Sequence, residues 1–393
     1  MTLLPVAEAL ERLLAGARPV ESETVPLADA LGRWAAAPAH APRTQPSRDL
    51  SAMDGYAIRH ADLPGPWHIM GESAAGRPFA GEIGAGEAAR IFTGAAMPAG
   101  ADTVLVQEEA AREGDRLTLA GEGPGTQGRN VRLRGLDFTT GQPLVLVGER
   151  LTPARLAVAA TAGVDQMSVR RRVRVALAST GDELVEPGID PGEDRLPESN
   201  RLMLRALLAD LPVEVIDLGI LPDRLDVIRD AFAGVTCDLL VTTGGASVGD
   251  HDLVRPALEA AGATIDFWRI ALRPGKPMMA GRLGDAQVLG LPGNPVSAFV
   301  TAVLFVRPLV AALAGAGDPH PRLDPAVMGE DLPGNGPRTN YLRATRRDGR
   351  VHVAPIQDSS MLLTLARADC LVMRAADAPP LSAGDSVEIL SLA

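Results

Sequence analysis

The sequence has almost no lysine. Of the 38 basic residues in the 393-residue chain, Lys276 is the only lysine, and the rest are arginines. A bias of this size tends to replace any lysine whose role is only to carry positive charge. Lysine is a compact point charge with three rotatable donors, whereas arginine is a planar fork. Lys276 therefore marks a position where arginine does not serve, which makes it a candidate active-site residue; chance survival is the alternative.

Cysteine is scarce too, with only Cys237 and Cys370. No Cys-x-x-Cys pair occurs, which argues against a disulfide framework or a structural zinc site. Cys237 precedes an apolar run and is expected to be a buried small hydrophobe. The net charge of −11 argues against binding to nucleic acid or to anionic membranes. An anionic substrate would therefore need a local basic pocket.

Long apolar runs are absent as well. The longest, residues 295–306, ends at Arg307 and falls short of the roughly 18–20 residues that span a bilayer. Residues 1–17 lack the basic start of a signal peptide and are typical of an amphipathic helix, with Pro5 in its first turn. Apolar residues make up 46% of the chain, enough for several cores. These features predict a soluble, cytoplasmic protein of roughly two to four domains.

The pattern changes along the chain. Residues 38–46 are rich in proline and alanine and are typical of a linker, whereas residues 50–147 carry short strand-like runs between turns, such as 67–70, 103–106 and 144–147. Thr152 and Pro153 then predict the start of a helix, which we expect to pack on the N-terminal helix. We predict an α/β plus β multidomain protein: a small discontinuous N-terminal domain (1–45 and 146–171), a β-rich insertion domain (46–145), a doubly wound α/β domain (172–317) and a C-terminal β domain (318–393).

In the α/β region, apolar strands alternate with helices. Expected strands are 173–178, 213–218, 239–242 and 288–291, and expected helices are 200–208, 224–232, 253–261 and 296–314. Strands that are apolar throughout predict a parallel sheet covered on both faces.

Four loops with glycine, proline, hydroxyl and acidic residues follow strand ends in this region: 179–184, 242–252, 273–277 and 291–297. Ligands of open α/β sheets bind at the carboxyl ends of the strands. Glycines let backbone N–H groups approach a phosphate, acids could hold Mg²⁺, and the helix after residue 294 favours anions at its start. Each loop alone is typical of an ordinary turn, but together they predict a site for a phosphate-bearing small molecule.

One motif suggests a different chemistry. Gly245, Ser247 and Gly249 fit the G-x-S-x-G nucleophile elbow of serine hydrolases. That mechanism needs a helix directly after the serine and an oxyanion motif upstream. Here Asp250-His251-Asp252 follows, and no such motif precedes it, so the hydrolase interpretation is disfavoured.

Three segments together resemble a known family: Ser51–Ala57 (SAMDGYA), Gly244–Gly249 (GGASVG) and Pro292–Ser297 (PGNPVS). With Ile91–Ala95, Ser179–Leu184 and Arg273–Pro277, in chain order, they are similar to the MoeA-type molybdopterin molybdenumtransferases. The resemblance implies insertion of molybdate into adenylylated molybdopterin with release of AMP, and Mg²⁺ as cofactor. It also implies a homodimer of four-domain subunits, with the site between the α/β domain of one subunit and the β-rich domain of the other, and a molybdopterin adenylyltransferase as a possible partner.

The family's motifs also indicate candidate site residues. The catalytic candidates are Asp54, Thr93, Glu183, Asp223, Asp252 and Lys276. The substrate-binding candidates are Gly244, Gly245, Ser247, Arg273, Pro292, Asn294, Pro295, Ser297, Arg343 and Ser359. The metal candidates are Glu183, Asp250 and Asp252.

Structural roles are the alternatives for several of these residues. Asp54 could shape a turn, Glu183 and Asp223 could cap helices, and the two prolines of the 291–297 loop could only shape it. The chain also departs from the family pattern, with Arg273 in place of the usual lysine and Glu198 in place of the usual aspartate. A molybdopterin adenylyltransferase and a non-catalytic pterin carrier remain the alternative functions.

Overall fold

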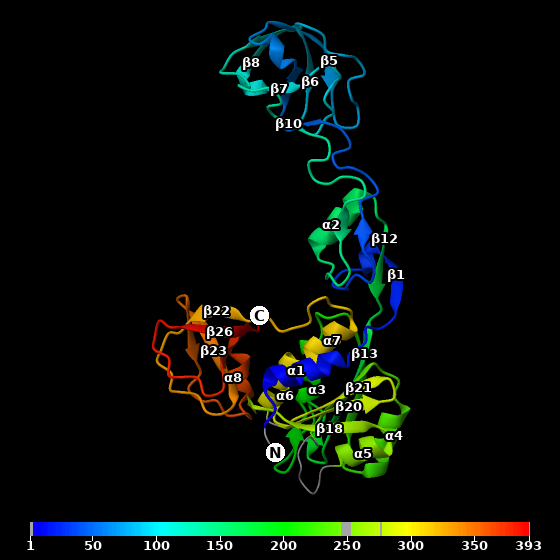
Figure 1. Ribbon diagram of the computed structural model, residues 1–393, viewed down its shortest axis with the longest axis vertical. Coiled ribbons are helices and arrows are strands. Elements are labelled where there is room, and N and C mark those ends of the chain that lie inside the picture. The colour runs from blue at the N-terminus through cyan, green and yellow to red at the C-terminus, as the bar shows by residue number, and fades with distance from the viewer. Residues whose placement is uncertain (1–2, 245–252, 276, 393) are drawn as a thin grey trace.

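The computed structural model describes residues 3–244, 253–275 and 277–392. Buried hydrophobic side chains form several separate clusters, so the chain folds as linked bodies. Figure 1 shows an elongated, L-shaped molecule. A β-rich body stands at one end, a narrow middle body connects it to the α/β body, and the C-terminal β body projects to the side.

The β-rich body is built on a six-stranded sheet in the order β7-β4-β6-β5-β9-β8. Its core includes Tyr56, Ile58, Trp67 and Leu117. The strands predicted at 67–70 and 103–106 are confirmed, the first extended by three residues. The bounds are β4 (Gly55–Ile58), β5 (Trp67–Ser73), β6 (Glu87–Ile91), β7 (Thr103–Val106), β8 (Ala110–Glu113) and β9 (Arg116–Leu119), with a side pair of β3 (Leu50–Ser51) and β10 (Val131–Arg132) and the short helices η2 (His60–Asp62) and η3 (Gln107–Glu109).

The middle body joins two distant parts of the sequence. Antiparallel pairs link β1 to β12 and β2 to β11, and the hydroxyl of Thr152 caps the predicted helix by accepting the N–H of Arg155 at 3.3 Å. The segment predicted as a linker contains β2, so that expectation is wrong for these residues. The bounds are β1 (Ser22–Pro26), η1 (Leu27–Asp29), β2 (Ala39–His40), β11 (Pro143–Val145), α2 (Pro153–Ala162) and β12 (Gln166–Arg170).

The sequence suggested that the N-terminal helix α1 (Val6–Ala15) packs on α2. In the structure it does not. Its buried face, Ala9, Leu10 and Leu13, joins the core of the α/β body, where α1 lies against α7 (Arg307–Leu313). An amphipathic pattern identifies a buried face but not its partner, which is why the sequence alone placed this helix wrongly.

The α/β body has a six-stranded sheet in the order β16-β13-β17-β21-β20-β18. The first four strands are parallel, as predicted, and helices α3, α6 and α7 cover one face while α4 and α5 cover the other. The bounds are β13 (Val173–Thr180), α3 (Asn200–Leu207), β16 (Val213–Leu221), α4 (Leu225–Gly234), β17 (Leu239–Thr243), α5 (Val254–Ala260), β18 (Thr264–Arg269), β20 (Pro277–Leu283) and β21 (Ala286–Leu291).

The sequence did not predict β18 and β20, which continue the sheet as antiparallel strands. The sheet is therefore mixed, an arrangement common among large α/β sheets. Beyond the sheet, the short strands β14 (Leu184–Val185) and β15 (Leu196–Pro197) pair with each other.

The predicted long helix is interrupted. It consists of α6 (Pro295–Thr301), a π-helical turn η4 (Ala302–Val306) and α7 (Arg307–Leu313). Pro308 cannot donate a backbone hydrogen bond to the preceding turn, which accounts for the break. By length and composition the 19 residues could cross a membrane, but 78% of the segment's most apolar stretch is buried inside the protein. Its hydrophobicity therefore serves the core.

The C-terminal body is a β sheet in the order β19-β23-β25-β26-β22, with β24 also paired to β23. Strand β19 belongs to the α/β part of the chain, and its parallel pairing with β23 ties the two bodies together. The bounds are β19 (Leu272–Arg273), β22 (Asp324–Val327), β23 (Thr339–Arg347), β24 (Arg350–Val353), α8 (Leu362–Ala366), β25 (Cys370–Arg374) and β26 (Ser386–Ser391).

Arg171 connects the middle body to the α/β body. Its guanidinium donates to both carboxylate oxygens of Asp238, at 2.7 and 2.8 Å, and to Glu21 at 2.7 Å. Asp238 stands directly before β17 and also accepts the N–H of Arg174 at 2.7 Å. Burial acts to raise the pKa of Asp238, but the hydrogen bonds from Arg171 and Arg174 outweigh it, and the pKa is lowered.

Asp238→Asn should lower the free energy of unfolding by about 1–3 kcal/mol, because it breaks a largely shielded bidentate ion pair. The folded-state pKa lies below the unfolded value, so this stabilisation is present above about pH 4 and is lost as the pH falls through the folded-state pKa. Urea denaturation at pH 7 and at stepwise lower pH measures both effects. Arg12→Ala, which breaks an exposed pair with Glu8, is the control and should change stability by less than about 0.5 kcal/mol. A loss that does not shrink with falling pH would contradict this account.

Candidate functional site

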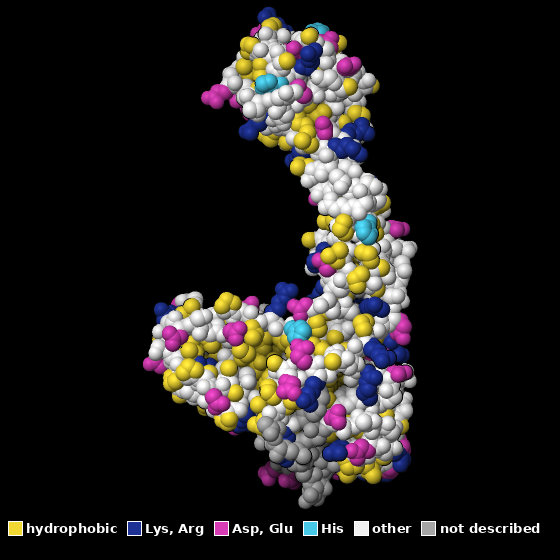
Figure 2. Space-filling view, viewed as in Figure 1, with side chains coloured by type: hydrophobic (Ala, Val, Ile, Leu, Met, Phe, Trp, Pro, Cys, Tyr) yellow, Lys and Arg dark blue, Asp and Glu magenta, His cyan; other side chains and the backbone are white. Residues whose placement is uncertain are grey.

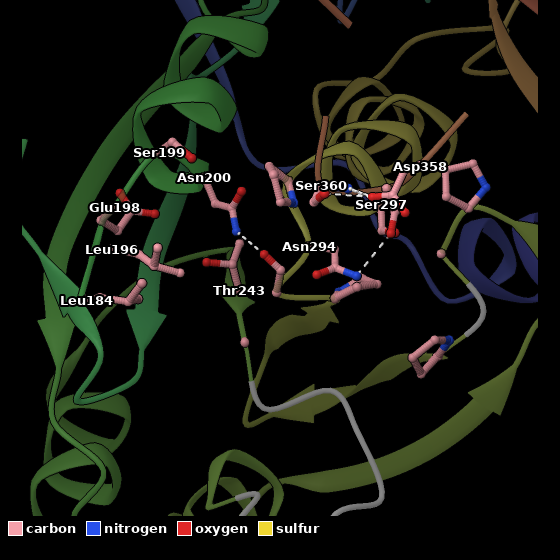
Figure 3. A pocket seen from close by; sticks show the side chains of 18 of the residues that line it. Leu184, Leu196, Glu198, Ser199, Asn200, Thr243, Asn294, Ser297, Asp358 and Ser360 are labelled. Carbon is pink, nitrogen blue, oxygen red and sulfur yellow. Dashed lines mark hydrogen bonds between the residues drawn. The ribbon is translucent and has the colours of Figure 1, made fainter. Parts of the chain in front are cut away.

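A cavity of about 960 Å³ opens where β13, β17 and β21 end. Its walls come from the α/β body on one side and from the C-terminal body on the other (Figure 3). Its lining includes Thr180, Glu183, Glu198, Asn200, Thr243, Gly244, Arg273, Pro292, Gly293, Asn294, Pro295, Ser297, Arg338, Gln357, Asp358, Ser359 and Ser360.

The backbone approaches closely at Gly244, directly after β17. This residue has φ +87°, a conformation that favours glycine, and a Cβ built there would lie 2.8 Å from the carbonyl oxygen of Thr180. Any larger residue would push apart the ends of β13 and β17. The glycine therefore lets two strand ends meet at the floor of the cavity.

A buried polar cluster fixes this floor. The hydroxyl of Ser179 donates to Glu198 at 2.9 Å and lies 2.9 Å from the hydroxyl of Thr243. The same oxygen of Glu198, whose residue is only 3% exposed, also accepts the N–H of Arg201 at 2.9 Å. Glu198 therefore holds the start of α3 against the ends of β13 and β17.

Two amides clamp the loop before α6. The side chain of Asn200 donates to the carbonyl of Gly293 at 2.7 Å, and the side chain of Asn294 donates to the hydroxyl of Ser359 at 3.1 Å (Figure 3). The N–H of Val296 donates to the carbonyl of Ser359 at 3.1 Å. The loop is thus held from both walls, and the second clamp joins the α/β body to the C-terminal body.

Arg343 lies behind the C-terminal wall. Its side chain is 1% exposed and donates to the side-chain oxygen of Gln357 at 3.1 Å and to the carbonyl of Met361 at 3.2 Å. Burial lowers the pKa of Arg343, and the nearby Asp358 opposes that shift. Gln357 in turn donates to the carbonyls of Arg343 and Ala354. Arg343 therefore holds the segment that carries Ser359 and Ser360.

Two other arginines face the cavity itself. Arg273 lies in β19, between β18 and β20, and Arg338 directly precedes β23. Neither guanidinium has a carboxylate within ion-pair distance among the described residues. Because a cation without an internal partner is free to meet an anionic ligand, these two side chains supply the positive potential of the described site.

The structure brings together eight of the predicted site residues at this cavity: Glu183, Gly244, Arg273, Pro292, Asn294, Pro295, Ser297 and Ser359. Five candidates, Gly245, Ser247, Asp250, Asp252 and Lys276, lie outside the described residues. Cavity residues absent from the predicted set are Asn200, Arg338, Gln357 and Ser360, among others. Arg338 lies five residues before the predicted Arg343, and only the structure shows that Arg338, directly before β23, lines the cavity.

Asp54 and Thr93 lie elsewhere, in the β-rich body. One carboxylate oxygen of Asp54 accepts the N–H and the hydroxyl of Thr93, at 2.7 and 2.8 Å, and these bonds lower the pKa of Asp54. No described residue of 46–145 lines the cavity, and Figure 1 shows this body at the opposite end of the molecule. Within one chain, this pair is separate from the cavity.

Asp223 is also outside the cavity wall. Its carboxylate accepts the N–H of Asp182 at 3.3 Å, and the carboxylate of Asp182 accepts the N–H of Asp223 at 3.1 Å. This reciprocal pair closes the turn after β13 against the turn before α4. The described contacts give Asp223 a local structural role.

The described residues contain only part of the predicted metal site. No group of three or more His, Cys, Asp or Glu side chains suited to a metal occurs among the described residues. Of the three predicted Mg²⁺ ligands, only Glu183 is described, and it faces the cavity. Mg²⁺ binds through one or two carboxylates together with substrate phosphates, so the single described acid is compatible with such a site.

Comparison with protein families covers most of the chain. Residues 4–163 match the MoeA N-terminal region (domain I and II), residues 176–312 match the "Probable molybdopterin binding domain", and residues 325–392 match the MoeA C-terminal region (domain IV).

Individual relatives agree along the whole length. The molybdopterin molybdenumtransferase of Haemophilus influenzae is 36% identical over 381 residues, covering 94% of each chain. That of Nostoc is 34% identical, covering 95% of this chain and 89% of its own. The crystal structure of the molybdopterin biosynthesis moeA protein from Pyrococcus horikoshii superimposes with a TM-score of 0.86 at 28% identity, covering 99% of this chain and all of that one.

Arg343→Lys should reduce stability by about 2–4 kcal/mol, because lysine cannot reproduce the buried hydrogen bonds of the guanidinium. Arg338→Lys, the matched control on the cavity side, should change stability by less than about 1 kcal/mol, because its side chain has no internal partner to lose. Urea denaturation of both variants checks this. Unchanged stability in Arg343→Lys would contradict the positioning role given to that residue.

Proposed function

The chain belongs to the family of MoeA-type molybdopterin molybdenumtransferases, and from this premise we propose that it inserts molybdate into adenylylated molybdopterin and releases AMP. The observation that carries the proposal is the cavity at the ends of β13, β17 and β21, with Arg273 and Arg338 facing it. Molybdate and the phosphates of the adenylylated pterin are all anions. The cavity offers these anions two guanidinium groups that have no carboxylate within ion-pair distance among the described residues, in a protein of net charge −11.

Binding and positioning are the contributions we assign to the described residues. We place the anion nest at the loop that begins at Gly244 and at the 292–297 loop, which its two prolines keep stiff. We assign the pterin phosphate to this loop, with Ser297 and Asn294 as donors. We expect Lys276 to contribute an ammonium, a compact point charge with three rotatable donors, which suits charge that shifts as AMP leaves.

Mg²⁺ is the proposed cofactor. Glu183, Asp250 and Asp252 would hold it, and it would neutralise charge on the phosphoanhydride when bound. The role of the protein is then to bind both anions, exclude water and align them.

We further propose that the working unit is a homodimer. Asp54 and Thr93 lie in the β-rich body, away from the cavity of their own chain, so a second copy would have to bring them to it. Leu31, Leu146 and Val147 of the middle body are each more than half exposed, as apolar surface that a partner could cover. Figure 2 shows hydrophobic side chains on this narrow part of the molecule. A cytoplasmic location and a molybdopterin adenylyltransferase as supplier of the substrate complete the proposal.

The reaction itself tests the function. Incubation with adenylylated molybdopterin, Mg²⁺ and molybdate should release AMP only when molybdate is present. Consumption of ATP with unmodified molybdopterin would indicate an adenylyltransferase instead, and tight binding of the pterin without AMP release would indicate a carrier.

Lys276→Arg should fold normally and lose most of its molybdate-dependent turnover, by about tenfold or more, because a planar fork cannot replace a rotatable point charge. The control is Arg269→Lys, which makes the reverse exchange at a nearby position in the sequence. It should keep most of the activity. Normal turnover in Lys276→Arg would remove the significance we give to the lone lysine.

A mixing experiment tests the shared site. Asp54→Asn and Lys276→Ala should each be inactive, yet dimers that contain one copy of each keep one intact site. Unfolding and refolding the two variants together in equal amounts should restore about a quarter of the wild-type activity. No recovery, with heterodimers present by mass spectrometry, would place both residues in separate functions or in one chain's own site.

A further inference from the structure

A second pocket lies in the C-terminal body, outside the site described above. It has a volume of about 340 Å³ and is formed by β23, β24, the segment after β24 and the end of α8. The lining residues are Ala344, Thr345, Arg347, His352, Val353, Ala354, Pro355, Ile356, Thr364, Arg367 and Ala368. The proposed transferase function uses none of them.

None of the polar side chains that line this pocket is an acid; they are arginine, threonine and histidine. Arg347 and Arg367 carry two positive charges, and neither has a carboxylate within ion-pair distance among the residues that the structure describes. No acidic side chain lines the pocket. Arginine is the residue of choice for planar, bidentate recognition of phosphate, so two unpaired guanidinium groups in one pocket form an anion site.

Two acidic side chains next to lining residues of the pocket are already engaged with backbone N–H groups. Both oxygens of Asp369 accept the N–H of Arg346, and Glu330 accepts the N–H of Val353 at 2.7 Å. These carboxylates therefore shape the backbone around the pocket and leave the charge of Arg347 and Arg367 uncompensated.

The rest of the pocket is apolar and held in shape. Val353, Ala354, Pro355 and Ile356 line it in succession, and Ile356 is 54% exposed. The ring of His352 lies directly over Gly329, where a Cβ would come within 2.1 Å of the ring, so packing sets the position of the ring. The pocket thus offers positive charge, hydroxyl groups and an apolar stretch at residues 353–356.

We propose that this pocket binds a small phosphate monoester with an apolar or aromatic body. The phosphate would lie between Arg347 and Arg367, whose two charges match a dianion, and the body would lie on the 353–356 wall. The volume is at the lower end of the range for small-molecule sites and is too small for a folded partner. The site is distinct from the catalytic cavity, although Gln357, the next residue along the chain, lines that cavity.

Phenyl phosphate is the probe, titrated into the full-length protein by calorimetry. We expect saturable binding that weakens about tenfold or more in Arg347→Ala and in Arg367→Ala, since each loses a charge-assisted contact. Arg350→Ala is the matched control. Arg350 is the cross-strand partner of Arg347 at the hairpin tip but does not line this pocket, so binding should stay within about twofold. Unchanged melting temperatures would show that the variants fold.

Two further arms separate this pocket from its alternatives. Arg338→Ala alters the catalytic cavity and should leave phenyl phosphate binding intact; loss in this variant would place the anion in the catalytic cavity and overturn the proposal. Benzoate, with one charge, should bind more weakly than phenyl phosphate, and equal affinity would overturn the phosphate assignment. Absence of phenyl phosphate binding to the wild-type protein, or equal losses in Arg347→Ala and Arg350→Ala, would also contradict the proposal.

Discussion

The site depends on one geometric constraint: neighbouring parallel strands end at the same edge of a sheet. Strands β13, β17 and β21 are hydrogen-bonded neighbours, so the loops that follow them must meet. Gly244 lets these loops approach closely, and the buried Glu198 holds the start of α3 against the same edge. The cavity residues of the loops after β13, β17 and β21 take their places from this arrangement.

The other wall depends on the junction between two bodies. Strand β19 pairs with β23, and Ser359 accepts hydrogen bonds from the side chain of Asn294 and the N–H of Val296. Behind this wall Arg343 keeps the Gln357 segment in place. The C-terminal body is thus part of the site, because without it the loop before α6 would lose one of its two clamps.

Much of this could be predicted from the sequence, for physical reasons that also set the limit. Apolar strands alternating with helices have a period that the sequence displays directly, and the convergence of their loops follows from topology. The sequence does not show which elements pack or pair with one another. It therefore misplaced α1, whose apolar face fits any hydrophobic surface, and missed the antiparallel strands β18 and β20. It also indicated Arg343, which lies behind the wall, and not Arg338, which lines the cavity, because the sequence does not tell which side of the C-terminal wall a residue occupies. Asp54 raises the same difficulty at a larger scale: in the proposed homodimer a second copy would bring it to the cavity, and one chain alone gives no sign of this.

A crystal structure of the protein with adenylylated molybdopterin and molybdate tests the central claim most directly. The account predicts the pterin phosphate in the cavity between the 292–297 and 357–360 segments. Arg273, Arg338 or Lys276 should lie within hydrogen-bond distance of an anion, and Asp54 of a second copy should lie at the cavity. A pterin bound outside this cavity, or a cavity completed without the second copy, would contradict it.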